Sequence, residues 1–462
     1  MDLDITHIIL YHSLIVFGEI LIMFTFIHMI YRRRSSASMI AWLLFIILVP
    51  YIAVVLYFIF GFRKHKKSYT KTNMHLKKHK YEHKTLNPIS EILRNYNIAD
   101  TCNNEYFKLY SDPIKAYEIF IECIKSAKES IFLSTYVFKY DEITKIIIDE
   151  LIKKANEGVT IKILVDTLGS WKLYFSTYHL REMKKAGIQI HFFMPIFQMP
   201  FRNYINLRNH RKIYIFDNKQ VISGGINISR EYFGPNIDKL RWKDMLFLVK
   251  GRSAELFFEI FASDWFYASG EKLEFKNTPI NSEGNTSIQI VPSGPDMEKD
   301  VLYEALLCAI YSAKKRIWIV TPYFVPDTSI LQALIIAKHK GVDIKLITPK
   351  ESNHFVVDLA RNSYIHELEE AGIEVAMHSG VMIHAKAILF DYESVMLGSV
   401  NLDNRSLFLN YEIATFVYSK DVLKDIEKWM SELLADSSRD VKEISYAMKI
   451  VENLMRIVAP QL

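Results

Sequence analysis

Hydrophobic residues open the chain in two long runs, and shorter strand-like and helix-like patterns follow. The first run, residues 8–31, is apolar over enough residues to cross a bilayer as one helix. The second run, residues 39–60, is similarly apolar and contains Pro50, which kinks a membrane helix without excluding it. We therefore expect two transmembrane helices within residues 1–62.

A basic stretch follows the second run. Residues 63–80 are rich in Lys, Arg and His and contain no Asp or Glu. A solvated linker over 63–99 is one interpretation. The other is a strip that lies on anionic lipid headgroups, where each basic side chain contributes about 1 kcal/mol. We favour the interpretation in which the basic stretch binds lipid headgroups. Nucleic acid is a less expected partner, because the apolar runs would tether the chain to a membrane. Counting positive charges around the two runs places the rest of the chain in the cytoplasm.

The remaining chain is an internal repeat. Residues 158–164 match residues 341–347 in hydrophobic pattern and in their leading glycine. Each half alternates helical and strand patterns, which predicts an α/β fold with a mixed sheet and helices on both faces. We expect two tandem lobes, residues 100–280 and 285–462. A segment with Pro, Asn, Ser and Gly, residues 277–286, links them.

Two further segments are less regular. Residues 192–201 are apolar but contain two prolines, which excludes a helix. They form either a buried strand end with a loop or an apolar lip that enters the bilayer. Residues 441–456 have the pattern of an amphipathic closing helix. The hydrophobic content of 50% supports large cores, and the three cysteines show no pairing pattern.

The candidate chemistry lies in one motif that occurs twice, over residues 210–227 and 384–401. Both copies read H-x-K-x4-D-x6-G-[GS]-x-N, and every matched position has the same offset. One H-x-K is usually accidental, but six matched positions in two repeats are not. The candidate catalytic residues are His210, Lys212, Asp217, His384, Lys386 and Asp391.

These residue types suit an anionic phosphate better than a carbonyl. A neutral imidazole is a nucleophile and, once protonated, an acid near neutral pH. Two imidazoles at one phosphate would divide the work. One forms a phosphohistidine, and the other protonates the leaving alkoxide and then deprotonates the incoming alcohol. Asp217 begins a turn, and we expect it to hold that turn. No metal or other cofactor is needed. The predicted phosphate-binding residues, beside the lysines, are Asn227, Asn401 and Ser399.

Each imidazole also needs a carboxylate that orients it, as in a catalytic triad. The candidates lie just downstream of the motifs: Asp244 follows the first copy, and Glu412 follows the second.

The doubled motif resembles the HKD motif of the phospholipase D superfamily. Further segments resemble bacterial-type cardiolipin synthases, as does the N-terminal pair of apolar runs. These segments are residues 208–212, 224–228, 321–327 and 398–406, the last followed by Asn410 and Glu412.

This resemblance implies two lobes with one active site between them and favours His210 as the nucleophile. It implies a membrane-anchored phosphatidyltransferase that converts two phosphatidylglycerol molecules into cardiolipin and glycerol. Two alternatives use the same residues: a membrane-bound phospholipase D with water as acceptor, and a tethered nuclease. A non-catalytic scaffold that binds anionic lipid is a third, against which two complete motifs argue.

Overall fold

The computed structural model describes residues 5–31, 36–60, 87–195, 206–276, 284–297, 299–439 and 445–456. The expected basic strip at 63–80 lies outside them, as do most of the 277–286 linker and the second half of the 192–201 segment.

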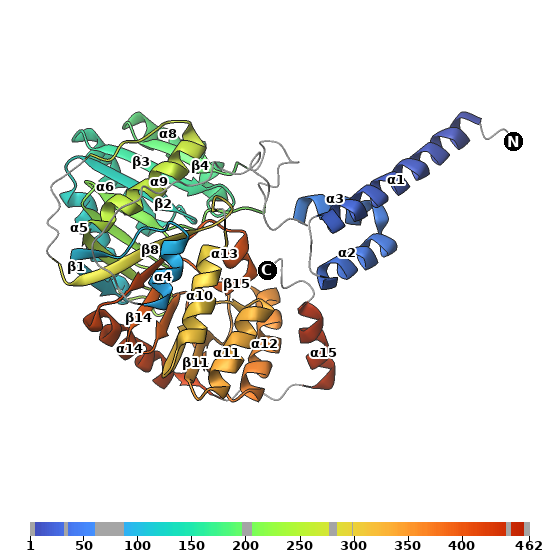
Figure 1. Ribbon diagram of the computed structural model, residues 1–462. Helices are drawn as coiled ribbons and strands as arrows, with labels where there is room; N and C mark the ends of the chain where they lie inside the picture. The colour runs from blue at the N-terminus through green and yellow to red at the C-terminus, as the bar shows by residue number, and fades with distance from the viewer. Residues whose placement is uncertain are drawn as a thin grey trace.

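Three apolar helices stand apart from the rest of the chain: α1 (Ile5–Tyr31), α2 (Ser36–Leu48) and α3 (Pro50–Phe60) (Figure 1). By length and composition α1 can cross a membrane. The expected second span is divided at Pro50, which begins α3, because proline disfavours helical backbone in the residue before it. A hydrogen bond between His28 Nδ1 and the Tyr57 hydroxyl, 2.9 Å long, links α1 to α3.

The first lobe begins with a strand that the sequence did not predict, and it then alternates helices and strands. Its strands are β1 (Cys102–Tyr110), β2 (Ser130–Thr135), β3 (Thr160–Asp166), β4 (Gln189–Phe193), β5 (Ile213–Phe216), β6 (Gln220–Gly224) and β7 (Leu246–Gly251). Its helices are α5 (Pro113–Ser126), α6 (Glu142–Asn156), α7 (Trp171–Tyr174), α8 (Thr177–Lys185) and α9 (Ser253–Ser269).

The second lobe repeats this order. Its strands are β8 (Thr286–Ser293), β9 (Arg316–Val320), β10 (Phe324–Val325), β11 (Asp343–Pro349), β12 (Glu374–His378), β13 (Ala387–Phe390), β14 (Ser394–Gly398), β15 (Leu402–Asp403), β16 (Glu412–Val417) and β17 (Ser437–Ser438). Its helices are α10 (Val301–Ser312), α11 (Thr328–His339), α12 (Phe355–Glu370), α13 (Asn404–Phe408), α14 (Lys420–Ala435) and α15 (Tyr446–Met455). One more helix, α4 (Pro88–Asn95), lies within the expected 63–99 linker, and its Ile89 and Leu93 join the core of this lobe.

Both lobes contribute to one mixed sheet. Among the described residues its order is β17-β12-β11-β9-β13-β14-β16-β8-β1-β7-β6-β5-β2-β3-β4. The central pair, β1 and β8, is antiparallel, with Cys102 opposite Ile288. In each lobe three parallel strands are followed by an antiparallel group that contains the motif. The predicted α/β fold with two lobes and a mixed sheet is confirmed.

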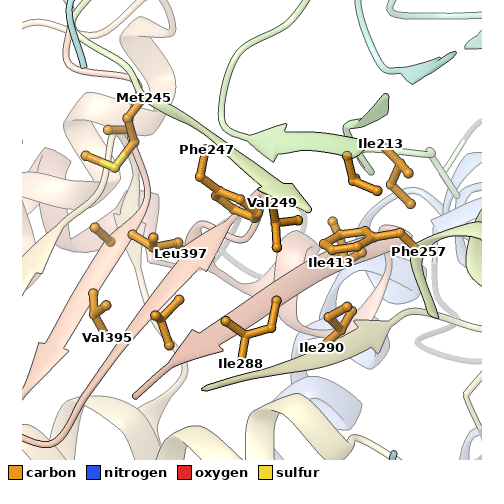
Figure 2. Packing of buried hydrophobic residues seen from close by; sticks show 14 of the residues in the cluster. Ile213, Met245, Phe247, Val249, Phe257, Ile288, Ile290, Val395, Leu397 and Ile413 are labelled. Atoms are coloured by element: carbon orange, nitrogen blue, oxygen red, sulfur yellow. The ribbon is translucent and has the colours of Figure 1, made fainter. Parts of the chain in front are cut away.

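Alternate side chains of the strands enter two different cores, because successive residues of a strand face opposite sides of the sheet. In β2, Ile131 and Leu133 pack with helices α5 and α6, whereas Phe132 enters the cluster that contains α9. The cluster on the α9 side is common to both lobes. Figure 2 shows first-lobe side chains such as Phe247 and Val249 beside second-lobe side chains such as Leu397 and Ile413. Since burying one such side chain stabilises by about 1.5–3 kcal/mol, this shared core holds the lobes together.

Candidate active site

The two motifs begin at corresponding places in the two lobes. His210 and Lys212 directly precede β5, and His384 and Lys386 directly precede β13. Strand β5 is antiparallel to β2, and β13 is antiparallel to β9. The histidines therefore lie at the edge where the parallel strands of each lobe end. This is the edge at which side chains and loops of an open α/β sheet gather.

Backbone hydrogen bonds join each motif to the opposite lobe. The His210 amide donates to the carbonyl of Tyr411 (2.9 Å), and the Tyr411 amide donates to the carbonyl of Arg208 (2.9 Å). The second motif has the equivalent arrangement, since the His384 amide donates to the carbonyl of Lys243 (2.8 Å). Each histidine thus lies beside the residue that directly precedes the other lobe's carboxylate.

The two carboxylates are consequently exchanged between the lobes. Asp244, which follows the first motif in sequence, places Oδ2 at 2.8 Å from Nδ1 of His384 in the second. Glu412, which follows the second motif, places Oε1 at 3.3 Å from Nδ1 of His210 in the first. In both pairs Nδ1 faces the carboxylate. Nε2 of His210 is thereby left available for chemistry, whereas Nε2 of His384 lies 3.2 Å from Nζ of Lys386.

Burial sets the protonation state of the imidazoles. It lowers the pKa of His384 to about 3, with a further contribution from the charge of Lys386 and opposition from Asp244. It also lowers the pKa of His210, although Glu412 opposes it. Burial disfavours ionisation of Glu412 as well, but His210, Lys212 and a hydrogen bond from Ser399 outweigh it and lower the pKa of Glu412. At neutral pH both imidazoles are therefore neutral, and the carboxylate of Glu412 is anionic.

The motif lysines lie close to the histidines. Lys212 Nζ donates to the carbonyl of His210 (2.8 Å), and Lys386 Nζ donates to the carbonyl of His384 and lies 3.2 Å from its Nε2. Burial lowers the pKa of Lys212 to about 8 and that of Lys386 to about 7. Lys212 also contributes to lowering the pKa of His384 and of Lys386, so the two motifs lie within electrostatic reach of each other.

The motif aspartates lie at the opposite ends of the strands. Asp217 accepts hydrogen bonds from the backbone amides of residues 128, 129 and 130, and Asp391 accepts them from residues 314, 315 and 316. Both aspartates have positive φ, at 52° and 50°. This geometry fits the role of holding a turn and gives neither carboxylate a contact with the histidines.

Three predicted phosphate-binding side chains are already engaged within the protein. The Asn227 amide accepts from Val137 N (3.2 Å) and donates to the Tyr232 hydroxyl (2.8 Å). The Ser399 hydroxyl donates to Glu412. The Asn401 amide forms a hydrogen bond with Asp403, and its oxygen is buried without a partner among the described residues.

Aromatic residues that the sequence reasoning did not select surround both histidines. The ring centroid of Tyr136 is 3.9 Å from that of His210. Those of Tyr232 and Trp242 are 5.1 and 5.4 Å from that of His384. A signal existed for Tyr136, because it follows the first repeat strand directly, at the edge where the motif begins.

Arg211 occupies the variable position between His210 and Lys212 and points away from them into the lobe interface. Its buried guanidinium lies 2.7 Å from an oxygen of Asp264 in the first lobe and 3.2 Å from one of Asp296 in the second. The second motif has Ala385 at this position. The ion pairs join the lobes directly behind the first motif.

Two H-x-K motifs in a two-lobed α/β sheet, with a carboxylate at each histidine, define a phospholipase D-like protein. The family described as "Cardiolipin synthase, PLD-like domain" matches residues 120–265 and 306–434, and "Phospholipase_D-nuclease N-terminal" matches residues 20–61. The chain belongs to the cardiolipin synthase family of phospholipase D-like proteins.

Individual relatives agree with this assignment. The chain is 35% identical to a cardiolipin synthase of Geobacillus kaustophilus over 74% of this chain and 70% of the relative. It is 31% identical to cardiolipin synthase 1 of Bacillus anthracis over 93% of this chain and 90% of the relative. Among solved structures, the phosphatidylserine synthase of Haemophilus influenzae Rd KW20 has a TM-score of 0.62 at 15% identity, covering 81% of this chain and all of that one. The last likeness concerns the fold alone.

Proposed function

We propose that this protein is a cardiolipin synthase, a phosphatidyltransferase that converts two phosphatidylglycerol molecules into cardiolipin and glycerol. Membership of the cardiolipin synthase family supports this directly. The observation that carries the mechanism is the presence of two complete motifs in which each histidine faces a buried carboxylate.

Both motifs act on one phosphodiester in this proposal. Nε2 of His210 attacks the phosphorus of the first phosphatidylglycerol, and a phosphorus–nitrogen bond forms. The bond from phosphorus to the headgroup glycerol breaks, and His384 delivers a proton to the departing oxygen. His384 then removes the proton from a glycerol hydroxyl of the second phosphatidylglycerol. That oxygen attacks phosphorus, and the phosphorus–nitrogen bond breaks to release cardiolipin.

The charges of the site fit these roles. The phosphodiester is an anion, and Lys212 and Lys386 supply preorganised positive charge where more negative charge develops. The bound phosphate also raises the pKa of His384 above its value in the free protein. Asp244 stabilises the resulting imidazolium, so His384 can hold the proton that the glycerol leaving group needs.

The finer site assignments are part of this proposal. Asp217 and Asp391 act by holding the turns beyond the motif strands. Asn227, Asn401 and Ser399 stay predicted phosphate-binding residues. The contacts of the free protein favour an indirect role for two of them: Asn227 acts through Tyr232, and Ser399 acts through Glu412.

We further propose that α1 spans the membrane and that α2 and α3 together form a second, kinked span. The two lobes, residues 100–280 and 285–462, then form one active site at the lipid surface. The basic residues after the second span outnumber those in the short loop before it, which favours the cytoplasmic side for the lobes. Anionic phospholipid is the partner as well as the substrate.

One incubation tests the function. The full chain in liposomes is given phosphatidylglycerol alone, with lipids measured by mass spectrometry and glycerol by an enzymatic assay. Equal amounts of cardiolipin and glycerol are expected. Phosphatidic acid with glycerol would mean that water is the acceptor and that the protein is a phospholipase D.

A further inference from the structure

Large apolar side chains are exposed on three loops around the candidate active site. Trp171 in α7 is 51% exposed. In the loop before β7, Ile237 is 85% exposed and Leu240 is 81% exposed. Phe355 at the start of α12 is 74% exposed. Exposed apolar groups that cluster in this way mark an interaction surface, whereas single ones are ordinary.

Each loop is tied to an aromatic residue of the site. Ser170, next to Trp171, donates to the carbonyl of Tyr136 (3.0 Å), whose ring packs on His210. Leu240 is two residues from Trp242, whose ring packs on His384.

The second-lobe loop is tied in the same manner. The hydroxyl of Tyr323 donates to Asn353 (2.5 Å), two residues before Phe355. Burial raises the pKa of Tyr323, and the charge of Asp403 raises it further. Tyr136 contributes as well, so Tyr323 and Tyr136 lie within electrostatic reach of each other. The exposed side chains therefore lie on segments that adjoin aromatic residues close to the two histidines.

The topology explains why these loops gather there. Strand β3 leads into α7, β6 leads into the loop before β7, and β11 leads into α12. All three strands end at the edges where the motifs begin, and the cross-lobe hydrogen bonds bring these edges together. The lipid substrate must reach the site through the same edge.

A basic side chain accompanies the apolar one in α7. Lys172 is exposed, and its Nζ lies 5.7 Å from the ring centroid of Trp171. Aromatic and aliphatic side chains next to positive charge match the interface of an anionic bilayer.

We infer that Trp171, Ile237, Leu240 and Phe355 form an interfacial rim that enters the anionic bilayer and opens the active site directly to the lipid phase. The inference rests on the proposed function for the choice of lipid as partner. It assigns to the lobes themselves a membrane contact separate from the N-terminal helices. A substrate held by its acyl chains would then present its phosphate to the histidines without leaving the bilayer.

The test measures local depth, because the N-terminal helices keep any variant on the membrane. Single cysteines at positions 171, 240 and 355 (Trp171→Cys, Leu240→Cys, Phe355→Cys) are introduced into the full chain carrying Cys308→Ser. The remaining native cysteines, Cys102 and Cys123, are buried.

The matched control is Ile336→Cys. Ile336 is exposed by 43% in the last turn of α11, which runs back from the active-site edge. Each cysteine carries an environment-sensitive dye in phosphatidylglycerol vesicles that contain a lipid with a quencher in its acyl chain. Each labelled variant should unfold at the same temperature as the unlabelled protein, which verifies that the variant is folded.

Quenching of the three rim dyes at least about threefold above that at position 336 is expected. Equal quenching at all four positions would overturn the inference. Energy transfer between rim dyes on different protein molecules would also overturn the inference if it increased with the ratio of protein to lipid. A second copy of the protein, rather than the bilayer, would then cover the rim. A failure of the proposed function looks different: the rim dyes are quenched, but no cardiolipin forms from phosphatidylglycerol.

The rim also has a kinetic consequence. The triple variant Trp171→Ser, Leu240→Ser, Phe355→Ser should turn over vesicle phosphatidylglycerol at least about tenfold more slowly, whereas Ile336→Ser should retain wild-type turnover. Equal turnover of the triple variant and Ile336→Ser would contradict a role of the rim in substrate access.

Discussion

Asp244 Oδ2 and His384 Nδ1 lie 2.8 Å apart, although the residues are separated by 140 positions and belong to different lobes. The complementary pair, Glu412 and His210, crosses the interface in the opposite direction. Neither histidine is oriented by the carboxylate that follows it in sequence. The geometry of each imidazole therefore depends on the packing of both lobes.

The first prediction concerns this exchange. Asp244→Asn should lower kcat about 10²- to 10⁴-fold with little change in KM, because an amide orients His384 less well and does not stabilise its imidazolium. Steady-state kinetics on phosphatidylglycerol measures it. Asp436→Asn, which alters only an exposed partner of Lys243, is the control and should stay within about twofold of wild type.

The second prediction assigns the nucleophile. His210→Ala should abolish all turnover and all covalent labelling, since no other group forms the phosphorus–nitrogen bond. His384→Ala should also be inactive in steady state but should retain labelling from a substrate whose leaving group needs no protonation. Acid-labile phosphatidyl-protein on a gel is the readout. Full activity in His210→Ala, or labelling lost only in His384→Ala, would reverse the assignment.

The third prediction is a pH profile. The lysine pKa values of about 8 for Lys212 and about 7 for Lys386 mean that both ammonium charges disappear from the free protein as the pH rises through this range. The value of kcat/KM should therefore fall above about pH 7–8. A profile that stays flat to pH 9 would contradict these lowered values.

Folding stability should change in the opposite direction. Because the folded pKa of Lys386 lies below its usual 10.5, the unfolded chain binds more protons between about pH 7 and 10.5, and this lysine's contribution improves as the pH rises. Thermal unfolding followed over the same pH range separates this effect from loss of activity. Lys386→Met should unfold at a higher temperature than wild type at pH 6, with a difference that shrinks by pH 9.

The fourth prediction uses the one motif position at which the copies differ. A Cβ at Gly225 would lie 2.1 Å from Oδ1 of Asp244, so Gly225→Ser should displace that carboxylate and reduce kcat by at least about 10²-fold. Ser399→Gly removes the hydroxyl that donates to Glu412 and accepts from the Ile413 amide (3.1 Å), without introducing a clash, and should cost about tenfold or less. Steady-state kinetics of the two variants, each verified as folded, measures both effects. A larger loss of kcat in Ser399→Gly than in Gly225→Ser would contradict the argument that Asp244 leaves no room for a side chain at position 225.

The fifth prediction concerns stability. Arg211→Met should destabilise the protein by about 3–5 kcal/mol, because it leaves the buried carboxylates of Asp264 and Asp296 without their shared cation. Urea unfolding is the measurement. Arg230→Met removes an exposed pair with Glu142 and should leave the urea unfolding midpoint close to that of the wild type, because solvent screens exposed ion pairs.

Local pattern predicted much of the architecture. The alternating helix and strand signals led to the two-lobed α/β fold, and the leading strand of the first lobe was missed because β1 carries the polar residues of a half-exposed strand. Helix α4 was missed for a related reason. Its eight residues contain only three large apolar ones, and these become a recognisable core face only when α10 lies against them.

By itself, the sequence supplied the candidate site residues: two motifs contain the histidines and lysines, and two carboxylates stand downstream of them. Only the tertiary structure decided which carboxylate serves which histidine, and it added Tyr136, Tyr232 and Trp242 to their surroundings. The reason is physical. Residue types and spacing define what a strand can present at its end, but the partner across an interface depends on how the two lobes pack. Here the antiparallel contact of β1 and β8 and the core shared by the lobes set that packing.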